Sequence, residues 1–269
     1  MKKINIGIAG CLGNMGKELV KKAASDPRIN LSGVFEKKDH RYINQNLGEV
    51  LSVKTNLKIL SDPDAVFSLS DVVIDFTSPS STLNNIRYAN KNKTPLVIGT
   101  TGLTKKIYSE IVKASKKTPI LQSHNMSLGV NLLLDLVKQA SNILDKYNYD
   151  IEISETHHKH KIDAPSGTAI SLGEYAAKGR NDILDKVKVL DRNNKKRKTG
   201  EIGFSVQRAG EISGEHQVSF IGINDRIDLS HKAFNRSIFV NGAIDAAIFL
   251  TKQKPGLYTM ANVIKRVNK

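Results

Sequence analysis

The first sixteen residues hold the feature that most restricts the fold. Residues 3–9, KINIGIA, alternate apolar and polar side chains as a strand does, and the turn that follows, GCLGNMG, carries three glycines. Apolar residues then recur at helical spacing, and residues 29–35, INLSGVF, predict a second strand. The chain therefore opens with a strand–helix–strand unit, which favours two parallel strands.

Strand-like and helical segments continue to alternate through the first half of the chain. Apolar runs that predict further strands lie at residues 57–60, 71–76, 95–99 and 119–123, with helical patterns between most of them. This alternation favours an α/β fold with an open parallel sheet and right-handed crossovers, a Rossmann-like arrangement.

The pattern changes after a long helical segment at about residues 129–147. The segments DIEISETHHKHK, GEIGFSVQRAG, GEHQVSFIG and DRIDLSHKA alternate like strands and are separated by glycine-rich turns. One clear helix, SGTAISLGEYAAK, interrupts them. The second half is therefore predicted to be α+β with a mixed or antiparallel sheet, and the domain boundary falls near residue 127.

Composition limits the class of protein. The longest apolar runs are far shorter than the roughly 20 residues that span a bilayer, and the amino terminus lacks a signal-peptide pattern, so we expect a cytoplasmic protein with no membrane partner. Cys11 is the single cysteine, which excludes an intrachain disulfide and a cysteine-rich zinc site. We expect its thiol to be passive.

The net charge of +15 raises the question of a nucleic-acid partner. The one dense basic run, NNKKRKTG at residues 193–200, contains no aromatic side chain for base stacking and lies among turn-forming residues. We therefore expect a solvated loop and no nucleic-acid partner.

The glycine turn is a candidate nucleotide site. Its spacing is G-x-x-G-x-x-G, with Leu12 where the commoner G-x-G-x-x-G motif has its second glycine. Such a turn lets the backbone approach a pyrophosphate, whose charge the following helix N-terminus stabilises. Glu36 follows Gly16 by 20 residues, at the end of the next strand, where a carboxylate accepts the ribose hydroxyls of adenosine. Lys37 and Lys38 come next and suit a 2′-phosphate, so NADH and NADPH both stay open.

Two further loops follow predicted strands. They are IGTTG at residues 98–102 and SHNMS at residues 123–127. Open α/β sheets bind ligands at the carboxyl ends of their strands, so these loops, with their small and amide side chains, are predicted to contact a nicotinamide and its ribose.

The stretch ETHHKHKIDAPSGTA, residues 155–169, concentrates proton-donating and cationic side chains. If residues 151–161 ran extended, His157, Lys159 and Lys161 would share one face, and His158 and His160 would share the other. Ser166 begins a predicted helix, and a helix N-terminus binds carboxylates through its free N–H groups. Imidazoles, a lysine and such a helix start together predict a pocket for a small acidic substrate that receives a proton.

A metal site is an alternative for the same stretch. Zinc would have His157, His158 or His160 as ligands, but their spacing lacks the i, i+4 pairing of helical zinc ligands and a nearby third ligand. We therefore predict no metal. A merely solvated basic turn is a further alternative.

One segment also carries a family signature. The pattern E-x-H-H-x-x-K-x-D-x-P-S-G-T, from Glu155 to Thr168, resembles that of the 4-hydroxy-tetrahydrodipicolinate reductases, or dihydrodipicolinate reductases, of bacterial lysine and diaminopimelate biosynthesis. The segments AGCLGNMG, IDFTSP, VIGTTGL, HNMSLGVN, QRAGEISGEH and HKAFNRSIFVNGA match as well, so the resemblance spans essentially the whole chain.

The resemblance implies a role for each matching position. His157 would act as general acid, and Lys161 would donate a proton or neutralise developing charge. The substrate carboxylates would be held by His158, Ser166, Gly167 and Thr168. The nucleotide would be bound by Gly10, Cys11, Leu12, Gly13, Asn14, Met15, Glu36, Lys37, Gly99, Thr100, Thr101, Ser123, His124, Asn125 and Met126.

Domain organisation and assembly are implied in the same way. Residues 1–127, completed by residues 239–269, would form the dinucleotide-binding domain, and residues 128–238 the substrate-binding and oligomerisation domain of a homotetramer. The expected reaction is reduction of 4-hydroxy-tetrahydrodipicolinate, a small dicarboxylate, to tetrahydrodipicolinate by NADH or NADPH. Another two-domain nicotinamide-dependent dehydrogenase of amino-acid metabolism is the alternative.

Overall fold

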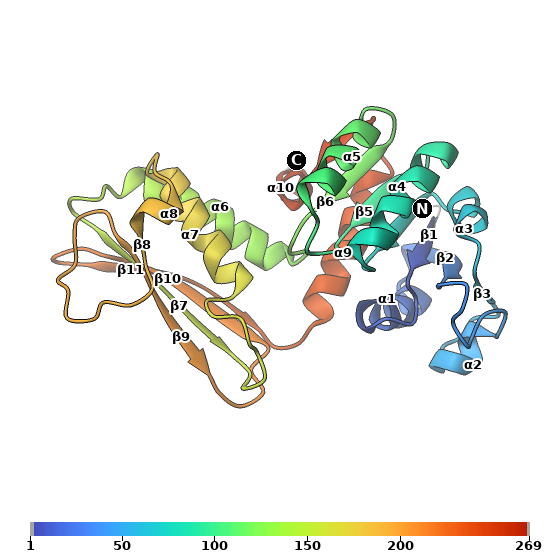
Figure 1. Cartoon of the computed structure of the whole chain (residues 1–269), viewed down its shortest axis with the longest axis horizontal. Helices are drawn as coiled ribbons and strands as arrows, with labels where there is room; N and C mark the ends of the chain where they lie inside the picture. The colour runs from blue at the N-terminus through green and yellow to red at the C-terminus, as the bar shows by residue number, and fades with distance from the viewer. Residues whose placement is uncertain (1–2, 268–269) are drawn as a thin grey trace. The chain divides into compact units, whose positions relative to one another are not determined.

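A computed structural model describes residues 3–267, which form two compact units. The first unit contains the chain up to Ser127 and from Ser237 onward, and the second runs from Leu128 to Arg236. Figure 1 shows the course of the chain through each unit.

The first unit is built on a parallel sheet of seven strands in the order β12-β6-β5-β4-β1-β2-β3. The strands are β1 (Ile4–Ala9), β2 (Ile29–Phe35), β3 (Ile59–Leu60), β4 (Val72–Asp75), β5 (Leu96–Ile98), β6 (Pro119–Gln122) and β12 (Gly256–Tyr258). The helices are α1 (Asn14–Ser25), α2 (Leu47–Leu51), α3 (Pro63–Leu69), α4 (Pro79–Asn92), α5 (Lys105–Ser115), α9 (Ser237–Leu250) and α10 (Met260–Val267).

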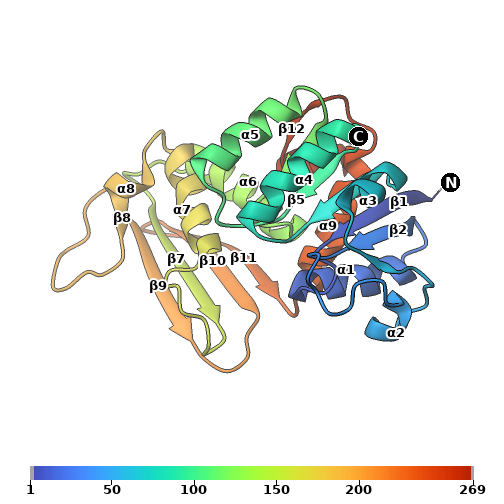
Figure 2. The same ribbon diagram turned by 45° about the vertical axis from the view of Figure 1, so that its right-hand side comes forward.

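Helices cover both faces of this sheet (Figures 1 and 2). Helices α1 and α9 pack together on one face, and α3, α4 and α5 form a row on the other. The central strands β4 and β5 are consequently buried along their whole length, which suits their apolar residues and also buries Asp75 at the end of β4. The strand order reverses between β1 and β4, which is where open α/β sheets bind their ligands.

Local sequence fixes where the covering helices begin. Asp62 and Ser78 cap α3 and α4 with their side-chain oxygens, and a proline follows each cap at the first helical position. Thr104 caps α5 by accepting a hydrogen bond from the Ile107 N–H. These caps fix the point where each helix begins, soon after the preceding strand ends, which keeps the connecting loops short.

The second unit is a mixed sheet of five strands in the order β11-β10-β7-β9-β8. The strands are β7 (Asp150–His157), β8 (Lys188–Val189), β9 (Ile202–Arg208), β10 (Gly214–Ile221) and β11 (Arg226–Ala233), and the helices are α6 (Leu128–Ile143), α7 (Gly167–Gly179) and α8 (Leu184–Val187). β10 runs antiparallel to β7 and β11, whereas β9 is parallel to β7 and β8. Figure 2 shows β9, β7, β10 and β11 side by side.

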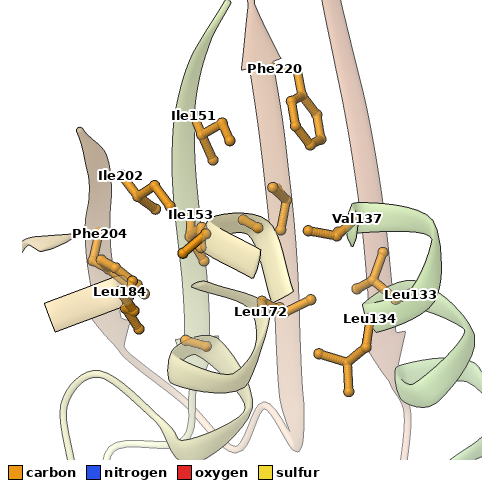
Figure 3. Close-up of a cluster of buried hydrophobic side chains, with 14 of the residues drawn as sticks. Leu133, Leu134, Val137, Ile151, Ile153, Leu172, Leu184, Ile202, Phe204 and Phe220 are labelled. Atoms are coloured by element: carbon orange, nitrogen blue, oxygen red, sulfur yellow. The ribbon is translucent and has the colours of Figure 1, made fainter. Parts of the chain in front are cut away.

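Helices α6 and α7 cover one face of the mixed sheet, and an apolar core lies between them (Figure 3). Ile151 and Ile153 of β7 lie beside Phe220 and Val218 of β10 and point into this core. Each such side chain contributes roughly 1.5–3 kcal/mol by leaving water. Because side chains alternate along a strand, the next two positions of β7 on the same face are Glu155 and His157, so polar groups end an otherwise apolar surface.

The structure confirms the predicted fold class, and several elements differ from the prediction. Helix α6 ends at Ile143 rather than near residue 147, because the Asp145 carboxylate accepts hydrogen bonds from the N–H groups of Tyr147 and Asn148 and forms a turn. Strand β12, which was not predicted, is a three-residue strand at the edge of the parallel sheet. Among residues 3–267, no helix is both long and apolar enough to span a membrane.

Candidate active site

The glycine turn connects β1 to α1 in a conformation that requires glycine at two positions. Gly10 has a φ of +66°, and a β-carbon at Gly16 would lie 2.0 Å from the Gly10 carbonyl oxygen. The N-cap of α1 is Gly13, which has no side chain to bond the first N–H groups of the helix. The turn therefore presents an uncapped helix N-terminus, which suits the pyrophosphate of a dinucleotide.

Glu36 lies against this turn. Its Oε1 accepts a hydrogen bond of 2.8 Å from the Leu12 N–H, and its Oε2 accepts one of 3.2 Å from the Lys37 N–H. Leu12 thus directs its N–H to the carboxylate and ties the glycine turn to Glu36. A carboxylate has about four acceptor positions, so Glu36 keeps capacity for ribose hydroxyls, and the exposed Lys37 stands beside it.

Cys11 is fully buried inside the same turn. Burial, assisted by the nearby charge of Glu36, raises the pKa of its thiol to about 12. The thiol stays protonated near neutral pH, so Cys11 contributes its backbone to the turn and its side chain to packing.

The other predicted nucleotide loops follow β5 and β6. Gly99 packs against Phe76 so closely that a β-carbon would lie 2.3 Å from the ring, and Thr100 is buried while Thr101 is exposed. In the second loop Ser123 Oγ donates to the Asn125 carbonyl oxygen at 2.7 Å. This bond folds the loop so that His124 is exposed, whereas the Met126 side chain is buried.

Asp75 was not predicted as a site residue, yet it links two of these loops. It ends β4 and is fully buried, and its Oδ1 accepts hydrogen bonds from Thr77 N–H at 3.0 Å, Thr77 Oγ1 at 2.6 Å and Thr100 Oγ1 at 3.3 Å. Gly10 approaches the same place, because its β-carbon would lie 2.7 Å from Thr77 Cγ2. One buried carboxylate therefore anchors the loops after β4 and β5 behind the glycine turn.

The predicted nucleotide residues consequently share one edge of one sheet. The glycine turn, Glu36, the loop 99–101 and the loop 123–126 follow β1, β2, β5 and β6, all of which are parallel. The carboxyl ends of parallel strands meet at the same edge, so the topology brings these groups together.

In the second unit, four buried or half-buried side chains meet at the carboxyl end of β7. Arg208 holds the Glu155 carboxylate with two bonds, from Nη1 to Oε2 at 2.9 Å and from Nη2 to Oε1 at 2.8 Å. His157 Nδ1 lies in hydrogen-bond contact with Glu155 Oε2. The ring of His216, on β10, packs edge-on against the ring of His157 with their centroids 5.0 Å apart.

The helix start that follows is attached to the same group. The Ser166 N–H donates a 2.9 Å bond to Glu155 Oε1, and Ser166 Oγ caps α7 by accepting from the Ala169 N–H at 3.1 Å. Ser166 Oγ also bonds His216 Nε2 at 3.0 Å. A β-carbon at Gly167 would meet no atom within 4 Å, so the first turn of α7 faces open space there.

Burial and pairing set the charges of this cluster. Burial favours a raised pKa for Glu155, but hydrogen bonds from Arg208, the Ser166 N–H and His157 outweigh it and keep this pKa below its ordinary value. Burial lowers the pKa of His157, and this effect prevails over the opposing attraction of Glu155. For His216, burial and the neighbouring His157 lower the pKa to about 4. Both imidazoles are therefore neutral near pH 7.

The contact with Glu155 fixes the tautomer of His157. An ionised carboxylate only accepts hydrogen bonds, so the proton of the neutral ring lies on Nδ1 and the lone pair on Nε2. Nε2 points toward Gly214, where a β-carbon would lie 2.9 Å from it. The absent side chain of Gly214 leaves Nε2 uncovered.

One expectation about this stretch is wrong. β7 ends at His157, and the chain then turns, so Lys159 and Lys161 do not continue its face. The N–H groups of His158 and Lys159 bond the carbonyl oxygens of Ile212 and Gly210, at 2.8 and 3.1 Å. Hydrogen bonds to the turn between β9 and β10 replace strand pairing there, and local periodicity does not reveal them.

Lys161 lies on the turn that follows β7, with its side chain about one-fifth exposed. Its Nζ contacts both carboxylate oxygens of Asp163, at 2.7 and 2.8 Å, and this bond lowers the pKa of Asp163. The carbonyl oxygen of Asp163 in turn accepts a 2.6 Å bond from Arg208 Nη2. The predicted cation is therefore paired with a carboxylate of its own loop.

Glu155, His157 and His216 place three ligand-type atoms within 4.8 Å of one another. Arg208 already contacts both oxygens of the carboxylate, and its positive charge opposes that of a metal ion. We therefore assign the cluster to an ion pair with two neutral imidazoles.

Two sequence models of a single family match this chain. A model described as the amino terminus of dihydrodipicolinate reductase matches residues 4–126, and one described as the carboxyl terminus matches residues 129–264. The chain belongs to the dihydrodipicolinate reductase family.

Individual relatives support this family assignment over nearly the full length of the chain. A 4-hydroxy-tetrahydrodipicolinate reductase of Chelativorans sp. (strain BNC1) is 42% identical over 267 residues, covering 98% of this chain and 96% of the relative. One from Wolbachia pipientis wMel is 40% identical over 265 residues, covering 97% and 100%. The solved dipicolinate-bound dihydrodipicolinate reductase from Paenisporosarcina sp. TG-14 has a TM-score of 0.77 at 24% identity over 96% of this chain and 98% of that one, which shows a shared fold.

Membership of the dihydrodipicolinate reductase family confirms the predicted resemblance and enzyme class. The chain is an oxidoreductase that uses NADH or NADPH. The sequence analysis did not predict the pairing of Glu155 with Arg208, the presence of His216 in the same cluster, or the anchoring of two loops by Asp75. The sequence offered one sign of these residues, which is that they lie in segments that match the family. Arg208 and His216 lie in QRAGEISGEH, and Asp75 lies in IDFTSP.

Proposed function

We propose that this chain reduces 4-hydroxy-tetrahydrodipicolinate to tetrahydrodipicolinate, with loss of water, in lysine and diaminopimelate biosynthesis. The observation that carries the proposal is the placement of His157 and the start of α7 around the buried Glu155 carboxylate, with Lys161 on the turn that follows β7 close enough to affect the charge of His157. Relatives 37–43% identical bear the name of this reductase, and the Paenisporosarcina structure is described as dipicolinate-bound, which supports a dicarboxylate substrate.

The nucleotide is held by the first unit. The uncapped N-terminus of α1 takes the pyrophosphate, Glu36 takes the adenosine ribose, and Lys37 takes a 2′-phosphate where there is one. The loops 99–101 and 123–126 contact the nicotinamide end. When bound, the reduced nicotinamide supplies hydride, and the second unit supplies a proton and a positive charge to the substrate.

Two groups of the second unit handle the proton and the charge. The Lys161 ammonium neutralises a substrate carboxylate or developing negative charge and can release a proton. His157 has a neutral ring with Nε2 uncovered, so it acts as an acid only after it gains a proton at Nε2. Glu155 supports that charged form because it faces Nδ1.

The substrate carboxylates are placed by the start of α7. Ser166 has both its N–H and its Oγ engaged, so its role is to shape the helix start rather than to bind directly. Gly167 and Thr168 follow it at the helix N-terminus, and His158 lies on the neighbouring turn. The Asp163 carboxylate pairs with Lys161, and a substrate carboxylate would take over that partner.

A steady-state assay tests the proposed reaction. The condensation product of pyruvate and aspartate semialdehyde should be reduced with consumption of NADH or NADPH. Homoserine-pathway substrates should give no turnover, because they lack the second carboxylate. No turnover with the condensation product and either nucleotide would overturn the assignment.

A homotetramer and a cytoplasmic location stay predictions that rest on the family resemblance. The face of the mixed sheet opposite α6 and α7 carries mostly polar side chains, such as Ser154, Ser205 and Gln217, and is the surface we propose for assembly. Light scattering coupled to size-exclusion chromatography should give four times the mass of the 29.6 kDa chain.

A further inference from the structure

The Glu155 carboxylate has all its acceptor positions filled. It accepts two bonds from Arg208, one from the Ser166 N–H and one from His157, which equals the roughly four lone-pair positions of a carboxylate. Glu155 is 2% exposed, and an ionised side chain at that depth is costly unless it is paired and hydrogen-bonded in this way. The arrangement is therefore specific in geometry as well as charge.

We propose that Glu155 and Arg208 form a positioning pair for His157, in which Glu155 orients the ring and supports its charged form while Arg208 limits that support. The inference rests on the proposed function, in which His157 carries a proton. His157 touches the reacting partners, and Glu155 and Arg208 act through it.

The charged groups around His157 act in opposite directions. Glu155 on β7 stabilises the imidazolium, whereas Arg208 on β9 and Lys161 on the following turn destabilise it. The neutral ring of His216 on β10 fills the remaining side, and His231 on β11 affects His216 rather than His157. Changes to Glu155 and to Arg208 should therefore move the titration of His157 in opposite senses.

The same pair joins the ring to the proposed substrate cradle. Glu155 Oε1 holds the Ser166 N–H at the start of α7, and Arg208 Nη2 holds the Asp163 carbonyl oxygen. The orientation of the His157 ring and the position of the helix start are thus fixed by one carboxylate. A salt bridge that served stability alone would not need the contact with the ring.

Glu152 offers a matched control on the same strand. It lies three residues before Glu155 and points to the opposite face of the sheet, where Arg192 Nη2 bonds its Oε1 at 3.0 Å and Arg197 also contacts it. Glu152 therefore has the charge and the arginine partners of Glu155 but no imidazole. Its loss reports the effect of breaking an arginine–glutamate pair alone.

The test is an NMR titration of His157 in the full chain, read from its ring signals in the wild type, Glu155→Gln, Arg208→Met and Glu152→Gln. The midpoint should fall by about one pH unit in Glu155→Gln, because Glu155 contacts the ring, and rise by a smaller amount in Arg208→Met, because Arg208 contacts Glu155 rather than the ring. Glu152→Gln should leave it in place. Unchanged midpoints in Glu155→Gln and Arg208→Met, or shifts of the same sign, would overturn the proposal.

A further variant and an activity profile complete the test. If Glu155→Gln does not fold, Arg208→Lys should bring the midpoint part of the way back from that of Arg208→Met, because lysine keeps the charge but not the two-bond geometry. A midpoint no nearer to the wild type than that of Arg208→Met would overturn the proposal. The pH profile of kcat/KM should follow the NMR midpoints. Opposite NMR shifts with an unmoved profile would support the positioning pair and reject the proton-carrying role of His157.

Discussion

Gly214 leaves space for Nε2 of His157, because a β-carbon at position 214 would lie only 2.9 Å from that nitrogen. Gly214→Ala should cover Nε2 or displace the ring, and a displacement of about 1 Å costs on the order of 10²-fold in turnover. Nucleotide affinity should be unchanged, since Gly214 belongs to the second unit. Steady-state kinetics with nucleotide titration checks both. Glu215→Ala, whose side chain points to the other face, is the control, and equal losses in the two variants would contradict this reading.

Lys161→Ala removes the cation that pairs with Asp163. Turnover should fall by a factor on the order of 10²–10⁴, because the substrate loses a countercharge and a proton donor. Nucleotide binding, measured by fluorescence titration, should stay the same. Lys159→Ala is the matched control, as Lys159 lies on the same turn with its side chain exposed, and it should keep wild-type turnover. Undiminished activity of Lys161→Ala would remove Lys161 from the mechanism.

Glu36→Ala should weaken NADH binding about tenfold or more, since a charged acceptor of ribose hydroxyls is lost. The Leu12 N–H loses its partner as well. NADPH binding should suffer less, because its 2′-phosphate depends on Lys37 rather than on a carboxylate. Isothermal titration of both nucleotides checks the difference, and Lys37→Ala should give the reverse order of losses. Equal weakening of both nucleotides by Glu36→Ala would contradict the ribose assignment.

His216 should make the folded state sensitive to acid. Its pKa in the folded state is about 4, below the 6.5 of an ordinary histidine, so between these values the unfolded chain binds more protons. The contribution, on the order of 3 kcal/mol, is present above pH ~6.5 and is lost as the pH falls toward ~4. Urea unfolding across this range should show a shallower decline in His216→Gln than in the wild type. His160→Gln, at an exposed position, should behave like the wild type, and identical slopes in all three proteins would refute the assignment.

The sheet and the loops predicted to bind the nucleotide followed from local patterns. Alternation and glycine spacing are properties of short segments, so β1, β2 and the turn between β1 and α1 were predictable from residues 3–35. Arg208 shows why the rest was not. It lies 53 residues from Glu155, and only the parallel pairing of β7 with β9 brings the two together. The apolar face of β7 predicts that Glu155 is buried, but periodicity does not identify the partner that makes its burial tolerable.

Asp75→Asn should weaken nucleotide binding about tenfold, because the Asp75 carboxylate anchors Thr77 and Thr100 and so holds the loops after β4 and β5. An amide keeps one acceptor but places a buried donor at Oδ2, which is buried and has no hydrogen-bond partner in the described chain. Denaturant unfolding should therefore also show a loss of about 1–3 kcal/mol. Asp71→Asn is the control, since Asp71 lies just before β4 at its other end, and its exposed carboxylate accepts a hydrogen bond from the Asn5 N–H. Reduced stability with unchanged nucleotide affinity would show that Asp75 serves folding alone. A loss of affinity at temperatures where the variant is fully folded would show that its carboxylate supports the loops predicted to bind the nucleotide.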